Sequence, residues 1–379
     1  LDPPHSPIAK ISDIFGRAEA YTLAVALYAL GYVIVASSNG IEVFIAGIVV
    51  QSAGSTGLQV LQAIIVADTT SPQYRGLVLA IINIPYLINF AIAGPLVDLV
   101  IRRASWRWGF WIWTIVIPIA ACPLLITLAL GQRKAKQMGV GPSRSERRPN
   151  RFFRLFNELD FLGLLLLAIG WLLVLLPLTL RDHFSTALSL YLALGGSAVL
   201  LLFLFWETKA SIPILPFRVL SNRPVVYVCL IGLLDFASFT LSWTYLSAFI
   251  QVLRSWEQTR TAYFATTQNI TSTLMGIVVG YAMSTTRRYK TLMVGGVIVR
   301  LIGVSMMIRY RNQYDPTFML VLCQLLQGIG GGAVAITMQV ACQICVRHSV
   351  ISLVTAFELL TTEVSVAICA APKGLISSR

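Results

Sequence analysis

The chain has 379 residues, of which 56% are hydrophobic and only 12% are charged, and its mean hydropathy is +0.77. Soluble domains carry about 25% charged residues, so a water-soluble fold has no place for this much apolar surface. The formal net charge of +13 does not indicate a nucleic-acid partner, because the basic residues lie in the gaps between apolar runs. The composition therefore predicts an all-α membrane protein in contact with the lipid bilayer.

Apolar runs of membrane-spanning length follow one another along almost the whole chain. A helix needs about 20 mainly apolar residues to cross the hydrocarbon core. We predict a first helix bundle over 1–131, a basic cytoplasmic linker over 132–158, an inserted helix pair over 159–206 and a second helix bundle over 207–379. The eleven predicted spans are 19–38, 42–66, 77–99, 109–131, 159–179, 187–206, 224–251, 263–284, 291–309, 317–343 and 350–371.

The distribution of Lys and Arg predicts the orientation of these spans. Placing the loop around Asp13 in the cytoplasm puts eighteen of the 29 basic residues inside and eight outside, as the positive-inside rule requires. The strongest contribution comes from the Arg-rich segment 131–158. We interpret this segment as a topology anchor, with a switch for lipid or partner binding as the alternative.

The loop before the first predicted span contains Asp13-x-x-Gly16-Arg17. It resembles the cytoplasmic loop signature of the major facilitator superfamily, G-x-x-x-D-x-x-G-R, with Ala9 in place of the first glycine. The acid can accept hydrogen bonds from a helix N-terminus or pair with an arginine, while glycine permits a tight reversal. The resemblance implies a clasp that holds one conformation closed on the cytoplasmic side, whereas the alternative is an ordinary surface turn.

A later loop repeats this frame in degenerate form. Gly280 stands at the first position, Ser284 replaces the acid and Arg288 matches Arg17. A second correspondence links two small-residue helices, in which Gln51-x-x-Gly54-x-x-Gly57 is echoed by Gln327-x-x-Gly330-x-x-Ala333. Small residues at this spacing allow helices to approach closely. We therefore expect two related bundles, as in alternating-access transporters, with Gly280 and Arg288 as the second half of the gate motif.

Within this superfamily, the inserted spans 159–179 and 187–206 mark the fourteen-helix members. On that resemblance the eleven spans correspond to the third to thirteenth helices, and the chain is expected to lack the first two and the last. A truncated product without transport activity stays open as an alternative.

Several segments look like the fungal siderophore-iron transporters. The segments that carry this resemblance are Pro7 to Arg17, Gly57 to Gln62, Trp106 to Gly109, Asp235 to Phe239, Ile308 to Arg311 and Gly328 to Gly332. The resemblance implies proton-coupled uptake of ferric siderophores across the plasma membrane or a vesicular membrane. The alternative is a proton-coupled drug or toxin efflux pump, although only Gly94-Pro95 remains here of the fifth-helix signature of such pumps.

Charged side chains inside a membrane span are costly and usually functional. Asp235, about twelve residues into its span, is our first candidate for proton exchange or substrate contact, followed by Glu358 and Glu363. Arg300 lies near the middle of its span and could neutralise an acid across the bundle. Amide and aromatic side chains complete the predicted cavity, with helix packing as the alternative for each: Gln59, Gln62, Asn83, Tyr86, Trp243 and Tyr245.

Other kinds of site find no support in the sequence. It contains no P-loop, catalytic triad or metal-ligand spacing, so we expect a protein that is not an enzyme, has no cofactor and uses an ion gradient. We also expect the protein to be a monomer. The six cysteines all lie in apolar runs, where a disulfide framework has no purpose.

Overall fold

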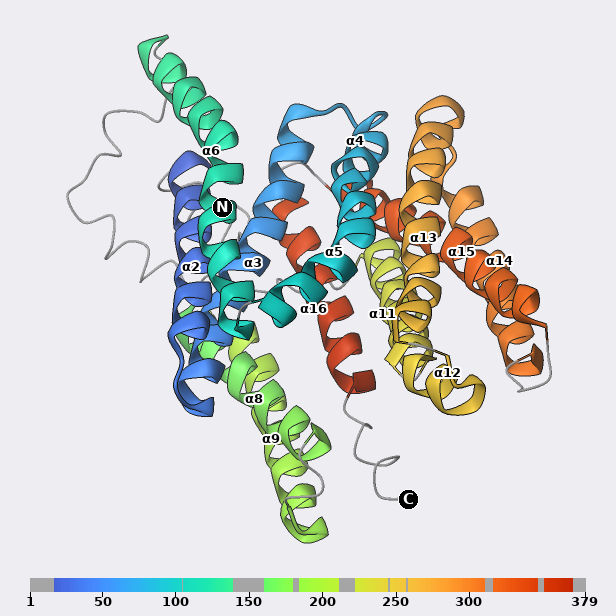
Figure 1. Cartoon of the computed structure of the whole chain (residues 1–379). Coiled ribbons are helices and arrows are strands. Elements are labelled where there is room, and N and C mark those ends of the chain that lie inside the picture. The colour runs from blue at the N-terminus through green and yellow to red at the C-terminus, as the bar shows by residue number, and fades with distance from the viewer. Residues whose placement is uncertain are drawn as a thin grey trace. The chain divides into compact units, whose positions relative to one another are not determined.

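The computed structural model of the chain describes residues 17–103, 105–138, 160–179, 184–210, 222–244, 246–256, 258–310, 316–346 and 351–370. Every regular element in these ranges is a helix, coloured in chain order in Figure 1. The helices are α2 (Arg17–Ser37), α3 (Ile41–Thr69), α4 (Arg75–Ile82), α5 (Ile84–Arg103), α6 (Trp106–Gln137), α8 (Phe161–Thr179), α9 (Thr186–Lys209), α11 (Arg223–Thr244), α12 (Leu246–Arg254), α13 (Gln258–Thr286), α14 (Tyr289–Tyr310), α15 (Thr317–Ile344) and α16 (Ile351–Ala370).

All eleven predicted spans coincide with helices, and the span 77–99 is divided into α4 and α5 at Asn83. The span 224–251 covers α11 and α12, and residue 245 between them lies outside the described residues. Pro85 follows the break at Asn83; it lacks a backbone N–H and disfavours helical geometry in the residue before it. In the described ranges, seven helical segments are long and apolar enough to cross a membrane: Arg17–Ser37, Ile41–Thr69, Trp106–Lys134, Thr186–Lys209, Arg223–Val252, Tyr289–Tyr310 and Thr317–Ile344.

The described helices form two compact units. The smaller unit holds residues 17–65 and 92–160, and the larger unit holds 66–91 and 161–370. The larger unit therefore combines the helices from α8 onward with a short earlier piece of the chain, which contains the end of α3, α4 and the beginning of α5.

The smaller unit is held together by small residues and a few polar contacts. A Cβ atom added at Gly54 would collide with the backbone of Tyr28, so α2 and α3 approach closely there, as predicted. The Gln132 side chain donates to Glu19 Oε2 at 2.8 Å and joins α6 to α2. Arg107 at the start of α6 donates to the Ser38 carbonyl oxygen at 3.0 Å.

The larger unit is built around α15, whose glycines face two neighbouring helices. A Cβ atom at Gly328 would lie 2.6 Å from the Gln268 carbonyl oxygen of α13, and one at Gly332 would collide with the backbone of Ser272. A Cβ atom at Gly330 would lie 2.6 Å from the backbone nitrogen of Arg300 on α14. Because these glycines lack side chains, α15 packs closely against α13 on one face and α14 on another.

Candidate functional site

A cavity of about 380 Å³ lies among α4, α5, α13 and α15. Its polar groups are amides and hydroxyls, and none of its lining residues is charged. Such a surface can bind an uncharged polar molecule by hydrogen bonding and aromatic contact without burying an unpaired charge. The lining residues are Ala80, Asn83, Tyr86, Phe90, Asn269, Ser272, Thr273, Gly276, Gly332, Ala335 and Ile336.

The helix break at Asn83 forms one wall of this cavity. Asn83 caps α4 by donating its backbone N–H to the carbonyl oxygens of Ala80 and Ile81, and its own carbonyl oxygen accepts from Tyr86 N at 3.1 Å. Irregular backbone at membrane depth is tolerated where it lines a cavity, which is also where transporters place substrate sites. The break therefore brings the Asn83 amide and the Tyr86 ring to the same site.

A close contact between the beginning of α4 and the end of α13 borders the cavity. A Cβ atom at Gly280 would lie 2.9 Å from the Gly76 carbonyl oxygen, so the two helix backbones almost touch. The cavity residue Ala80 lies one helical turn after Gly76 on α4, and the cavity residue Gly276 lies one turn before Gly280 on α13. The cavity thus begins one turn from the point where the two helices come together.

Hydrogen bonds from Gln73 fasten this contact. The Gln73 Nε2 atom donates to the Ser284 carbonyl oxygen at 2.9 Å, and its Oε1 atom accepts from Arg287 Nη2 at 3.1 Å. Arg287 has a φ of 55°, in the left-handed region that non-glycine residues rarely adopt. We call Gln73, Ser284 and Arg287 the α4–α13 clasp.

The predicted gate motif is only partly described. Asp13 and Gly16 lie outside the described residues, and Arg17 begins α2. In the second copy of the motif, Gly280 lies where the backbone of α13 comes close to that of α4. Arg288 is exposed in the turn after α13, and its neighbour Arg287 makes the contact with Gln73.

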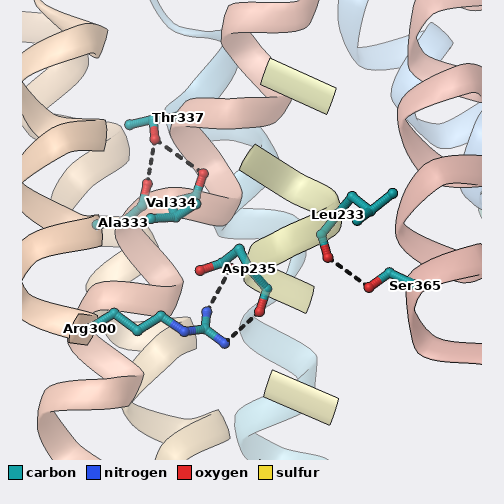
Figure 2. Close-up of polar contacts among 7 residues, drawn as sticks. All are labelled: Leu233, Asp235, Arg300, Ala333, Val334, Thr337 and Ser365. Carbon is teal, nitrogen blue, oxygen red and sulfur yellow. Dashed lines mark hydrogen bonds and ion pairs between the residues drawn. The ribbon is translucent and has the colours of Figure 1, made fainter. Parts of the chain in front are cut away.

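A buried ion pair joins α11 to α14, as Figure 2 shows. Arg300 Nη1 donates to Asp235 Oδ2 at 2.6 Å, and Arg300 Nη2 donates to the Asp235 carbonyl oxygen at 2.9 Å. The two side chains are only 8% and 10% exposed. Gly331 leaves room for the guanidinium group, since a Cβ atom there would lie 3.0 Å from Arg300 Nη1. Arg300 therefore lies against an acid of a neighbouring helix.

The two acids on α16 occupy different environments, as their five-residue spacing predicts. Glu358 is 4% exposed, whereas Glu363 is exposed. Near them, Ser365 donates to the Leu233 carbonyl oxygen at 2.7 Å and joins α16 to α11 (Figure 2). Of these two acids, only Glu358 is therefore placed so that gaining or losing a proton would change the charge in the protein interior.

The remaining predicted cavity residues do not form one group. Asn83 and Tyr86 line the cavity described above. Gln59 and Gln62 are exposed on α3 in the smaller unit and do not line it. Trp243 is 42% exposed and donates to the Ala265 carbonyl oxygen, while Tyr245 lies outside the described residues.

Comparison with protein families identifies the architecture. A family model described as Major Facilitator Superfamily matches residues 6–357. The chain belongs to the Major Facilitator Superfamily. Because this superfamily consists of membrane transporters and the chain has several membrane-spanning helices, it is an integral multi-pass membrane protein. The human organic anion transporter MFSD10 (TETRAN) shares the fold, with a TM-score of 0.60 and 15% identity over 97% of this chain and 72% of that one.

Curated relatives in this superfamily are named for iron and haem transport. The chain is 31% identical to siderophore iron transporter mirC of Emericella nidulans, over 98% of this chain and 63% of the relative. It is 32% identical to siderophore iron transporter 1 of Schizosaccharomyces pombe, over 96% and 60%. It is 28% identical to low affinity heme transporter str3 of the same yeast, also over 96% and 60%. The chain thus spans less than two thirds of the length of these relatives.

Sequence reasoning found only two of the eleven residues that line the cavity, Asn83 and Tyr86, and missed most of the clasp. Asn269, Ser272 and Thr273 come from a run of polar residues within the predicted span 263–284, and that run is a signal that a cavity lies beside it. Gln73 carried no such signal, because it is an uncharged residue in a loop and its partners lie more than 200 residues away.

Proposed function

We propose that this protein transports ferric siderophores across the plasma membrane by proton-coupled alternating access, and that it is a transporter and not an enzyme. The observation that carries the proposal is the uncharged, amide-lined cavity beside the α4–α13 clasp. The similarity to relatives named for siderophore iron transport supports the substrate class.

The chemistry of the cavity suits a metal ion that arrives already wrapped in a chelator. Such a complex presents organic carbonyl, hydroxyl and apolar groups at its surface. The Asn83 and Asn269 amides and the Ser272 and Thr273 hydroxyls can hydrogen-bond those groups, while the Tyr86 ring covers apolar parts. Iron itself is the cargo in this scheme and needs no protein ligands.

The clasp supplies the conformational element of alternating access. It joins α4, from the first half of the sequence, to α13, from the second half, on the side that the charge distribution predicts to be cytoplasmic. Opening the cavity toward that side requires these hydrogen bonds to break. We therefore assign Gln73 and Arg287 to the cytoplasmic gate.

Removing the clasp should favour the conformation that is open to the cytoplasm. We expect Arg287→Ala to raise the labelling rate of a cysteine introduced at Ala80 by about fivefold from the cytoplasmic side, since one hydrogen bond contributes about 1 kcal/mol. Arg288→Ala is the matched control, because it removes the same charge from the neighbouring exposed position. Equal labelling in the two variants would show that the clasp does not gate the cavity.

Uptake experiments test the substrate. The chain would be expressed in fungal cells that lack their own siderophore carriers, and accumulation of radioactive iron from a ferric siderophore would be measured. We expect Asn83→Ala to lower the apparent affinity about tenfold, since a lost hydrogen bond in a binding site costs about 1 to 2 kcal/mol. Thr267→Ala, on a half-buried position of α13 outside the cavity, should leave it unchanged.

The same cells distinguish the alternatives. Haem carries two carboxylates that would find no charged partner among the lining residues, so we expect slower uptake of haem than of an uncharged ferric chelate. Export of a loaded drug without any iron uptake would instead support an efflux pump. If cells that make the protein take up no iron, the proposed substrate is wrong.

A further inference from the structure

We propose that Glu358 on α16 binds the transported proton, and that Asp235 remains ionised in its pair with Arg300. The inference rests on the proposed function because it assumes proton-coupled transport. It reverses the order in which the sequence ranks the two acids, and it rests on the different surroundings that the structure gives them.

The carboxyl group of Glu358 is buried, and no ion pair to it is found among the described residues. The residue is 4% exposed, and its Oε2 atom makes no hydrogen bond within the described part of the chain. The hydrogen bond that Thr361 donates to Glu358, at 2.8 Å, goes to the backbone carbonyl oxygen and not to the carboxyl group. Burying an isolated carboxylate costs far more than burying a neutral carboxylic acid. In this conformation the site therefore favours the proton-bound form.

The helices that pack against α16 provide no cation for this carboxyl group. The buried side chains that α11 and α15 pack against α16 include the thiols of Cys229 and Cys342, and neither of these is a cation. The described residues of α8 and α15 include no charged side chain. On α11, Arg223 is exposed at the beginning of the helix, and Asp235 lies six residues beyond Cys229, roughly 9 Å along the axis.

Arg300 on α14, a buried cation of the same unit, is already paired with Asp235. It donates to both the carboxylate and the backbone carbonyl oxygen of that residue, at 2.6 and 2.9 Å. Protonating Asp235 would leave a buried guanidinium group without its counter-ion. Asp235 is therefore the poorer proton carrier of the two acids, and its pair with Arg300 holds α11 against α14.

These surroundings couple the proton to conformational change. Deprotonated Glu358 would leave a bare carboxylate between α11, α15 and α16, so its proton can leave only when these helices separate enough to admit water. Proton release and opening of the bundle then occur together. Only the proton is transferred. The Glu358 carboxyl group gains it on one side of the membrane and loses it on the other.

Glu358→Gln tests the proposal, because glutamine has the shape of the protonated side chain but cannot release a proton. In proteoliposomes with an imposed pH gradient, we expect the variant to exchange ferric siderophore at a rate near that of the unmodified protein. It should nevertheless fail to accumulate the chelate above equilibrium. Accumulation by the unmodified protein should rise as the external pH falls, whereas the variant should not respond. Glu363→Gln, five residues along the same helix and exposed, is the control and should behave like the unmodified protein.

A second measurement does not depend on the substrate. The infrared C=O band of a protonated carboxylic acid should be present in the purified unmodified protein and in Glu363→Gln, and absent in Glu358→Gln. If the band is present in all three, or if Glu358→Gln accumulates chelate like the unmodified protein, Glu358 is not the proton carrier. A band that behaves as expected in a protein that moves no siderophore would support the proton site and contradict the proposed substrate.

Discussion

Asp235→Ala is expected to destabilise the larger unit by about 3 to 5 kcal/mol, the usual cost of removing one partner of a buried ion pair. The Arg300 guanidinium would remain enclosed among α11, α14 and α15 with its charge uncompensated. We expect a lower yield of monodisperse protein in detergent and a lower midpoint of thermal unfolding. Both can be measured by size-exclusion chromatography and by a thermal shift assay.

A double variant separates loss of charge from loss of packing. In Asp235→Ala with Arg300→Met the unpaired cation is gone, and methionine replaces much of the arginine stem. We expect this variant to recover most of the thermal stability that the single change removes. If the double variant is as unstable as the single one, the pair stabilises the bundle through shape, not through charge compensation.

The helical architecture is predictable because the bilayer imposes a simple rule. A spanning segment must satisfy its own backbone hydrogen bonds over about 20 apolar residues, and a run of that length is visible in any hydropathy pattern. The break at Asn83 is harder to predict, since Pro85 is only one of several prolines in apolar runs. Pro118 and Pro123 lie inside α6, which continues through both of them.

The candidate site was predictable where charge is involved and unpredictable where packing decides. Asp235 and Arg300 stand out because both are charged residues within membrane spans, and opposite charges in that setting tend to meet. Sequence spacing separates Glu358 from Glu363 but does not say which of them is buried. The clasp depends on where α4 lies against α13, which no local pattern encodes.

The last prediction compares two glycine-to-alanine substitutions, one on α15 and one on α14, which should change the stability in opposite directions. Gly332→Ala places a methyl group against the backbone of Ser272, which cannot move without separating α13 from α15. We expect it to lower the stability of the purified protein by about 1 to 3 kcal/mol, the usual cost of overpacking. Gly295→Ala on α14 has no atom within 4 Å of the new methyl group.

That second change should raise the stability by about 0.5 to 1 kcal/mol, because alanine is less flexible than glycine in a helix. Thermal unfolding of the two variants in the same detergent gives the comparison. Opposite signs would show that α15 is held to α13 by backbone contact at Gly332. Similar behaviour of the two variants would mean that this interface is loose enough to admit a methyl group. In that case the α13–α15 wall of the cavity could also move to fit its ligand.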